Sequence, residues 1–136
     1  MAPTGIIENE TGTQCLIGYV LDVGQPDRRA RCRLTLTDAH LNRHGVVHGG
    51  IVATLLDNAL GATASLTVDE TGRVPFLTVT LTTSFIASAP AGAVLSAVGT
   101  VRGGGRSLLF LDGEVTDQEG TLIAQASGVF KRVPHR

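Results

Sequence analysis

The chain has 136 residues, of which 43% are hydrophobic, 11 are basic and 12 are acidic. This length fits one domain, spanning residues 1–136, and the hydrophobic fraction is enough to build a core. The net charge of -1 excludes an overall field that would attract nucleic acid or an anionic membrane surface, which favours small-molecule chemistry. The N-terminus lacks a basic segment followed by an apolar stretch, and no apolar run reaches membrane-spanning length. We therefore expect a soluble, cytoplasmic protein.

Two strands are expected in the first third of the chain. Residues 14–22 are mostly apolar, and residues 29–37 alternate strictly, which is the period-2 pattern of a half-buried strand. The turn residues 24–27 between them predict a hairpin. One face of the second strand is apolar, and the other carries the row Arg29, Arg31 and Arg33, which we interpret as a solvated face. Residues 1–12 and 133–136 are expected to be loose.

The two cysteines, Cys15 and Cys32, each lie within one of these strand-like runs and show no CxxC or Cys/His spacing. This pattern indicates two buried thiols in a reducing compartment. A disulfide between neighbouring strands is the alternative.

The rest of the chain predicts one helix and then four strands. Residues 49 to about 66 place apolar side chains over most of a helical wheel, which predicts a helix buried on nearly every side. Strands are expected at 76–86, 93–102, 106–116 and 122–132, and the short turns between them predict an antiparallel meander. The fold class is therefore α+β, with a curved antiparallel sheet of about six strands wrapped around one long central helix.

The start of this helix carries the first feature that suggests chemistry. His48 is followed by the glycine pair Gly49 and Gly50. Paired glycines allow another molecule to approach the backbone closely, and N–H groups at a helix start have no partner within the helix. With the positive end of the helix dipole, they can bind a developing oxyanion. The alternative is a tight entry into a crowded helix, with His48 buried and satisfied.

A single acid, Asp57, lies on the same apolar helix. Such a position is costly unless the carboxylate is paired or used, so a catalytic role ranks above a buried hydrogen bond to the backbone. His48 and Asp57 are nine residues apart, which is about 13.5 Å along a helix with roughly 180° of rotation between them. If both act on one carbon atom, the site must be shared between two subunits related by a two-fold axis. We expect an obligate dimer at least.

The combined pattern resembles the motif of PaaI-like hotdog-fold thioesterases, the type found in phenylacetate degradation. The pattern is Asn-x-x-Gly-x-x-His-Gly-Gly followed by Leu-x-Asp-x-x-x-Gly-x-Ala, and its matching residues are Asn42, Gly45, His48, Gly49, Gly50, Leu55, Asp57, Gly61 and Ala62. Further similarity extends from residue 80 to residue 126, so it covers most of the chain.

The resemblance implies hydrolysis of an acyl-CoA thioester, with an aryl-acetyl or medium-chain acyl group, and with no metal and no cofactor apart from the coenzyme A of the substrate. Asp57 would be the nucleophile or the general base that activates water. The N–H of Gly49 would polarise the thioester carbonyl, while His48 and Asn42 would hold the pocket. Relatives place a hydroxyl on the strand after the helix, which maps to Thr78, although an outward threonine is an equal alternative.

For the coenzyme A phosphates, cations are required, and Arg102 and Arg106 flank a triple-glycine turn. The backbone of Gly104 and Gly105 in this turn, and that of Gly50 at the helix start, is expected to contact substrate, although glycine-rich hairpin tips are also common without any ligand. The remaining histidines, His40, His44 and His135, show no metal-like spacing with a carboxylate or thiol. Relatives also suggest that dimers pair into tetramers.

Two other functions compete with this one. An enoyl-thioester hydratase or dehydratase has the same fold. Such enzymes generally pair an acid with a histidine one or two helical turns apart, and this sequence shows no such pair. A non-catalytic acyl-CoA-binding regulator would have kept the fold without the chemistry. The intact Asp57 and the lack of a clustered basic DNA-binding segment disfavour the regulator.

Overall fold

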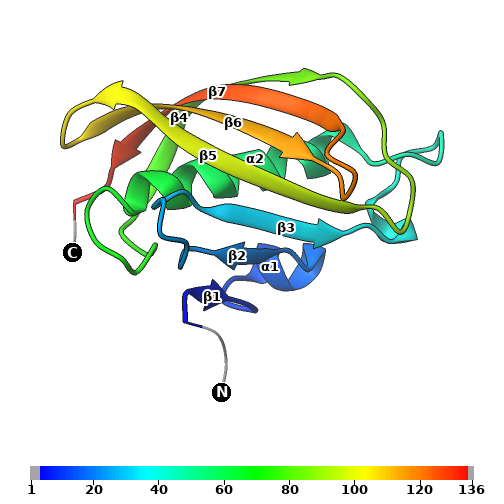
Figure 1. The fold of residues 1–136 in the computed structure, drawn as a ribbon, viewed down its shortest axis with the longest axis horizontal. Helices are drawn as coiled ribbons and strands as arrows, with labels where there is room; N and C mark the ends of the chain where they lie inside the picture. The colour runs from blue at the N-terminus through cyan, green and yellow to red at the C-terminus, as the bar shows by residue number, and fades with distance from the viewer. Residues whose placement is uncertain (1–3, 135–136) are drawn as a thin grey trace.

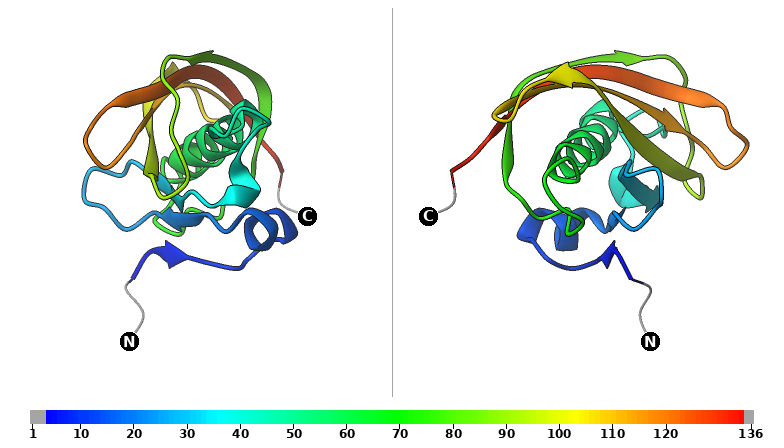
Figure 2. Two further views of the ribbon diagram at one scale, coloured as in Figure 1. Left: turned by 90° about the vertical axis from the view of Figure 1, so that its right-hand side faces the viewer. Right: turned by 60° about the vertical axis from the view of Figure 1, so that its left-hand side comes forward.

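The computed structural model describes residues 4–134 and shows one sheet curved around one long helix (Figure 1). The helix α2 spans Gly49–Ser65, and the sheet has the strand order β1-β2-β3-β5-β6-β7-β4. Seen along the helix and obliquely to it, the sheet curves around α2 (Figure 2). The predicted fold class is confirmed, with a seventh, two-residue strand in addition to the expected six.

The strands are short at the β1 edge of the sheet and long at the β4 edge. The strands are β1 Ile6–Ile7, β2 Val20–Asp22, β3 Arg31–Thr35, β4 Phe76–Phe85, β5 Val94–Gly104, β6 Leu108–Thr116 and β7 Leu122–Arg132. Two further helices are α1, Gly12–Ile17, and the 3₁₀ helix η1, Asp38–His40. All strand pairs are antiparallel. The predicted hairpin between β2 and β3 is confirmed by pairs such as Leu21 with Cys32.

The meander prediction is right for β5, β6 and β7 and wrong for β4. Strand β4 does not pair with β5, which follows it along the chain; β5 pairs with β3, and β4 pairs with β7 at the far edge. The chain therefore passes from one side of α2 to the other between Phe85 and Val94. A short connection requires only that two strand ends lie close together, and it does not require the strands to pair. Here the connection crosses the end of the helix, so β4 and β5 form no hairpin.

The N-terminal predictions need two corrections. Ile6 and Ile7 pair with β2, and Ile7 is buried, so this part of the expected loose segment belongs to the sheet. Residues 14–17 form the helix α1 and not a strand, because the Thr11 side chain caps the helix start and Gly18 ends it with a φ of 92°. Residues 1–3 and 135–136, including His135, lie outside the described residues.

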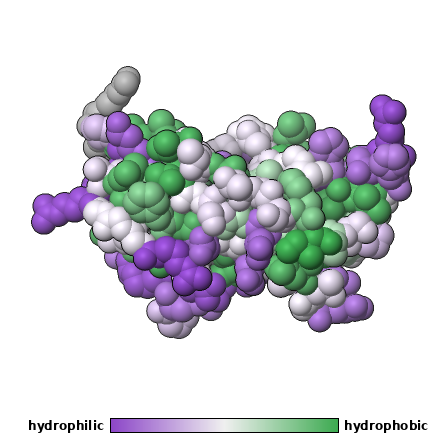
Figure 3. Space-filling model, turned by 90° about the horizontal axis from the view of Figure 1, so that it is seen from above, coloured by the Kyte–Doolittle hydropathy of each residue, from purple (hydrophilic) through white to green (hydrophobic). Residues whose placement is uncertain are grey.

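The core lies between α2 and the concave face of the sheet. Its largest fully buried side chains include Leu55, Leu56 and Leu60 of the helix and Phe130 of β7. The outer, convex face is different: Thr80, Thr82, Ser84, Gln125 and Ser127 are all exposed. Looking onto this face, polar and weakly hydrophobic residues separate the hydrophobic ones (Figure 3). Among the helices of residues 4–134, none has both the length and the hydropathy that a membrane-spanning helix requires.

The two cysteines differ, so the expectation of two buried thiols is half wrong. Cys32 is buried, and its burial raises the thiol pKa, whereas Cys15 is exposed on α1. Neither forms a disulfide. We expect a maleimide to label Cys15 in the folded protein and Cys32 only after unfolding, because only a thiolate that reaches solvent reacts. Mass spectrometry of native and denatured samples, with Cys15→Ser as the control, measures this; two labels on the native protein would contradict the burial of Cys32.

Candidate active site

His48 holds the start of α2. Its backbone is extended, with φ of -67° and ψ of 134°, and its Nδ1 accepts the N–H of Gly50 at 2.9 Å. The His48 N–H in turn donates to the carbonyl of His40 at 2.9 Å. A ring nitrogen that accepts a backbone N–H carries no proton, so His48 acts here as a helix cap. The Gly50 N–H is thereby used by the fold.

The neighbouring Gly49 keeps its N–H free. As the first residue of α2 it has no partner within the helix, and no acceptor for its N–H occurs among residues 4–134. A Cβ at this position would lie 3.3 Å from the ring of Phe85. The glycine therefore leaves its backbone open beside a cavity of about 340 Å³ that Asn42, Gly49, Phe85 and Ser88 help to line.

Asn42 shapes the loop that leads to this helix start. Its Oδ1 accepts the N–H groups of His44 at 2.9 Å and Val46 at 3.4 Å. The loop closes further through the N–H of Gly45, which donates to the Asn42 carbonyl and has a φ of 79°. Asn42 thus combines a structural task with a place in the Gly49 cavity. His44 is exposed, and its side chain makes no hydrogen bond within residues 4–134.

Asp57 meets a hydroxyl from the sheet. The Oγ1 of Thr78 donates to Asp57 Oδ1 at 2.5 Å. Strict alternation counted back from Phe85, which lies against Gly49, would turn Thr78 outward. The register of β4 against β7 shifts between Thr78 and Thr80, so Thr78 pairs with the buried Phe130 and faces the helix. The structure thus brings together two of the residues predicted for the site.

Around Asp57 lies a second cavity, of about 610 Å³. It shares no lining residue with the Gly49 cavity. Eight residues of helix separate Gly49 from Asp57, which is about 12 Å along the axis. Within one chain, the structure therefore does not bring the Gly49 N–H and the Asp57 carboxylate together. Each lies at its own cavity.

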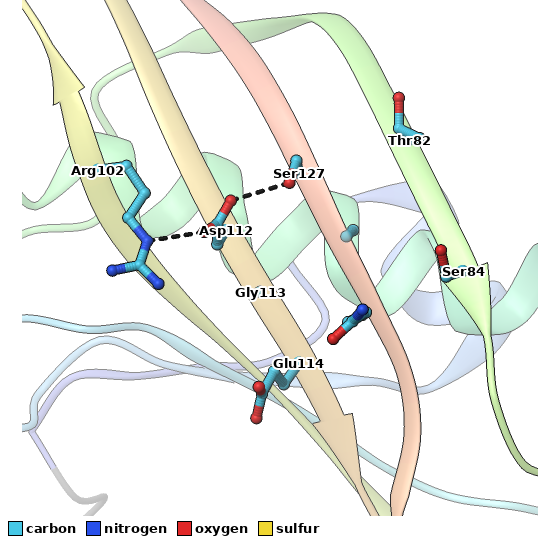
Figure 4. Close-up of a pocket in the computed structure, with 9 residues that line it drawn as sticks. Thr82, Ser84, Arg102, Asp112, Gly113, Glu114 and Ser127 are labelled. Carbon is cyan, nitrogen blue, oxygen red and sulfur yellow. Dashed lines mark hydrogen bonds and ion pairs between the residues drawn. The ribbon is translucent and has the colours of Figure 1, made fainter.

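Arg102 lies on the opposite face of the sheet from α2 (Figure 4). Its Nε donates to Asp112 Oδ2 at 2.7 Å, and Ser127 Oγ donates to Asp112 Oδ1 at 2.9 Å. The Arg102 hydrogen bond and then that of Ser127 lower the pKa of Asp112. Arg102 is thus engaged in a polar group on the outer face and is not brought near Asp57.

The glycines at the end of β5 have a structural explanation. The strand extends to Gly104, so the three glycines are not a free turn as predicted. Gly104 has a φ of 116°, and a Cβ there would lie 2.3 Å from the carbonyl oxygen of Leu108. The Gly105 N–H donates to the same carbonyl at 2.9 Å. Arg106 is exposed at the tip of this hairpin.

Most of the residues that line these two cavities were not predicted from the sequence, among them Phe85, Tyr19 and Asn58. Phe85 packs on Gly49, while Tyr19 and Asn58 line the Asp57 cavity. Tyr19 is the single tyrosine of the chain, and this rarity was the one available signal. Within residues 4–134, no group of three or more His, Cys, Asp or Glu side chains is placed to hold a metal ion.

Comparisons with known proteins assign the family. The profile of the "Thioesterase superfamily" matches residues 44–124, which include Gly49, Asp57 and Thr78. Human acyl-coenzyme A thioesterase 13 is 29% identical over 111 residues, which cover 81% of this chain and 77% of the human protein.

Solved structures agree on the fold. The BH2602 protein from Bacillus halodurans, solved with CoA, has a TM-score of 0.82 and 25% identity, over 96% of this chain and 83% of that one. The PaaI protein from the phenylacetic acid degradation operon of E. coli has a TM-score of 0.76 and 23% identity, over 92% and 86% of the two chains. The chain therefore belongs to the thioesterase superfamily, and it shares the hotdog fold of the PaaI protein.

Proposed function

We propose that this protein hydrolyses an acyl-CoA thioester to a free acid and coenzyme A, in a site shared by two chains. The observation that carries the proposal is the pair of half-sites: an acid with a hydroxyl partner, Asp57 and Thr78, and an unpartnered N–H, that of Gly49. The relatives support the substrate, because one is named an acyl-coenzyme A thioesterase and another was solved with CoA. The acyl group is an aryl-acetyl or a medium-chain one.

In this mechanism the Gly49 N–H binds the thioester carbonyl and stabilises the oxyanion that forms on attack. Asp57 either takes a proton from the attacking water or attacks the carbonyl itself, and water then cleaves the acyl-enzyme. In both courses the C–S bond breaks and the departing sulfur ends as the thiol of coenzyme A. The Thr78 hydroxyl orients the carboxylate, His48 caps the helix, and Asn42 holds the loop.

Strand β4 offers the surface that would join two chains. It forms one edge of the sheet, and Leu77, Val79, Phe85 and Ile86 are each more than half exposed on or just after it. An exposed apolar edge strand is a template for pairing with another chain. A two-fold pairing of β4 with its own copy would cover these side chains and complete a continuous sheet.

The same pairing would also complete the active site. Thr78 contacts Asp57 near the start of β4, and Phe85 contacts Gly49 at its end. In an antiparallel pair centred near Leu81 and Thr82, the start of one β4 lies beside the end of the other. Asp57 of one chain then faces Gly49 of its partner, and two equivalent sites form per dimer. Two such dimers pairing into a tetramer is compatible with this arrangement.

For the coenzyme A phosphates, we propose contacts with the backbone of Gly104 and the side chain of Arg106. The N–H groups of Gly50 and Gly105 are already bonded within the chain, to His48 Nδ1 and to the Leu108 carbonyl, and are not available to a phosphate. Arg106 forms no ion pair within residues 4–134, so its guanidinium is available to a phosphate. Arg102 is a weaker candidate, because Asp112 already engages its Nε.

Mixed dimers test the shared site. Asp57→Asn and Gly49→Pro chains, co-expressed with different tags, are each expected to be nearly inactive alone. Together they should regain about a quarter of the wild-type rate, because half of the dimers carry one site with both groups intact. Thiol release from acyl-CoA measures the rate. A mixture that forms mixed dimers and stays inactive would show that each chain carries its own complete site.

A further inference from the structure

His40 is a buried polar residue at the end of η1 that has no task in the proposed hydrolysis; its exposed fraction is 6%. Both nitrogens of its ring have backbone partners. Nδ1 accepts the N–H of Thr37 at 2.9 Å, and Nε2 lies 2.8 Å from the carbonyl oxygen of Ile17. Because the carbonyl can only accept, Nε2 carries the proton and Nδ1 does not. The neutral ring thus ties η1 to the last residue of α1.

The backbone of the same residue closes the loop that leads to α2. The carbonyl of His40 accepts the N–H of His48 at 2.9 Å, and beside this bond Leu41 pairs with Val47. His40 and His48 therefore lie opposite each other at the base of the loop. The peptide that follows His48 carries the N–H of Gly49. The direction of that N–H thus depends on where the His40 carbonyl is held.

The base of this loop has an anchor on each side. On one side the N–H of Val47 donates to the carbonyl of Ala89 at 2.9 Å. On the other side the ring of His40 attaches the loop to α1. Helix α1 is itself fixed, because the buried Gln14 donates through Nε2 to two backbone carbonyls, at 2.8 and 3.1 Å. The His40 ring is therefore the link between the loop and a firm part of the fold.

We propose that His40 is a positioning residue for the oxyanion donor, and that its bond to Ile17 keeps the Gly49 N–H aimed at the thioester carbonyl. The proposal rests on the proposed function, since it takes the Gly49 N–H as the donor. Such a donor is effective when it is fixed, before the reaction, at the place where negative charge develops. A displacement of about 1 Å in an active site can lower the rate by about 10²-fold.

Two variants of similar shape separate the two ring bonds. The amide N–H of His40→Gln can replace Nε2 as the donor to Ile17, whereas the Oδ1 of His40→Asn can replace only Nδ1 as the acceptor for Thr37. We expect His40→Asn to lower kcat for acyl-CoA hydrolysis by about ten- to a hundredfold with little change in KM, and His40→Gln by no more than about threefold. Thiol release measures both constants. A wild-type kcat in folded His40→Asn overturns the proposal.

A combination with Gly49→Pro distinguishes positioning from a purely structural role. If His40 acts through the Gly49 N–H, His40→Asn lowers kcat in the wild type but causes no further loss in Gly49→Pro, which has no N–H to position. The same factor in both backgrounds would mean that His40 acts elsewhere. If Gly49→Pro loses activity and His40→Asn does not, only the positioning proposal is wrong. If Gly49→Pro keeps the wild-type rate, the proposed function is wrong as well.

Gly18→Ala tests the same contact where His40→Asn does not fold. Gly18 ends α1 with a φ of 92°, and a Cβ there would meet no atom of residues 4–134 within 4 Å. Alanine is strained at this φ, and relief of the strain turns the peptide that carries the Ile17 carbonyl. We expect kcat to fall by about three- to tenfold. An unchanged kcat in Gly18→Ala then overturns the proposal.

The matched control is Gly120→Ala. Gly120 has a φ of 82° in the turn between β6 and β7, and a Cβ there is equally free of contacts with residues 4–134. This variant introduces the same strain far from His40 and should keep the wild-type kcat. A loss in Gly120→Ala as large as that in Gly18→Ala would assign the effect to strain in general and overturn the proposal.

Discussion

Replacing Asp57 by Asn is expected to lower kcat for acyl-CoA hydrolysis by about 10²- to 10⁴-fold, the range for loss of a general base. Asn has the same shape, and its Oδ1 can still accept the hydrogen bond from Thr78 Oγ1 that Asp57 accepts at 2.5 Å. What it lacks is the negative charge that takes a proton or attacks the carbonyl. KM should change little, because the lost interaction is made in the transition state.

The control for this change is Asp38→Asn. Asp38 is an exposed aspartate in η1 that lies outside both cavities, so its variant removes the same charge and should keep the wild-type rate. The steady-state rate of thiol release gives kcat, and thermal unfolding confirms that both variants fold. A wild-type kcat in Asp57→Asn would exclude the carboxylate from the chemical step.

Gly49→Pro is expected to lower kcat by about 10²- to 10³-fold, which is typical of the loss of one oxyanion donor. Proline removes the N–H and is well tolerated at the first position of a helix. The preceding residue must be extended, and His48 already is, with φ of -67° and ψ of 134°. The fold should therefore survive this change, which removes the donor and, like alanine, adds a Cβ beside the ring of Phe85.

Gly49→Ala is the matched comparison. Alanine keeps the N–H and adds a Cβ 3.3 Å from the ring of Phe85, so a small shift of that ring is needed. We expect Gly49→Ala to lose far less activity than Gly49→Pro, with similar unfolding temperatures. Equal losses would mean that the space beside Phe85, and not the N–H, is what the reaction needs.

The helix and its polar residues were predictable because their signals are local. Gly49–Ser65 is apolar over nearly its whole surface, and the glycine pair and Asp57 break that pattern within one continuous segment. Helix geometry alone also separates His48 from Asp57. Nothing beyond the segment itself was required.

The position of β4 and the direction of Thr78 were not predictable in this way. Both depend on pairing with β7, which lies some forty residues further along the chain. The register shift between Thr78 and Thr80 decides which face Thr78 occupies, and no local pattern marks it. The error at α1 is different, because Thr11 and Gly18 are visible start and stop signals that the apolar run obscured.

The order of the strands also determines when each can form during synthesis. Residues of β4 leave the ribosome long before their partners in β7, since Phe85 pairs with Ala124 and Phe76 with Arg132. Until β7 emerges, a nascent chain holds β4 without any strand beside it, and its apolar side chains remain open to other molecules. Slow translation or an interruption before Leu122 leaves this chain most exposed to aggregation, and nascent-chain chaperones are most needed there.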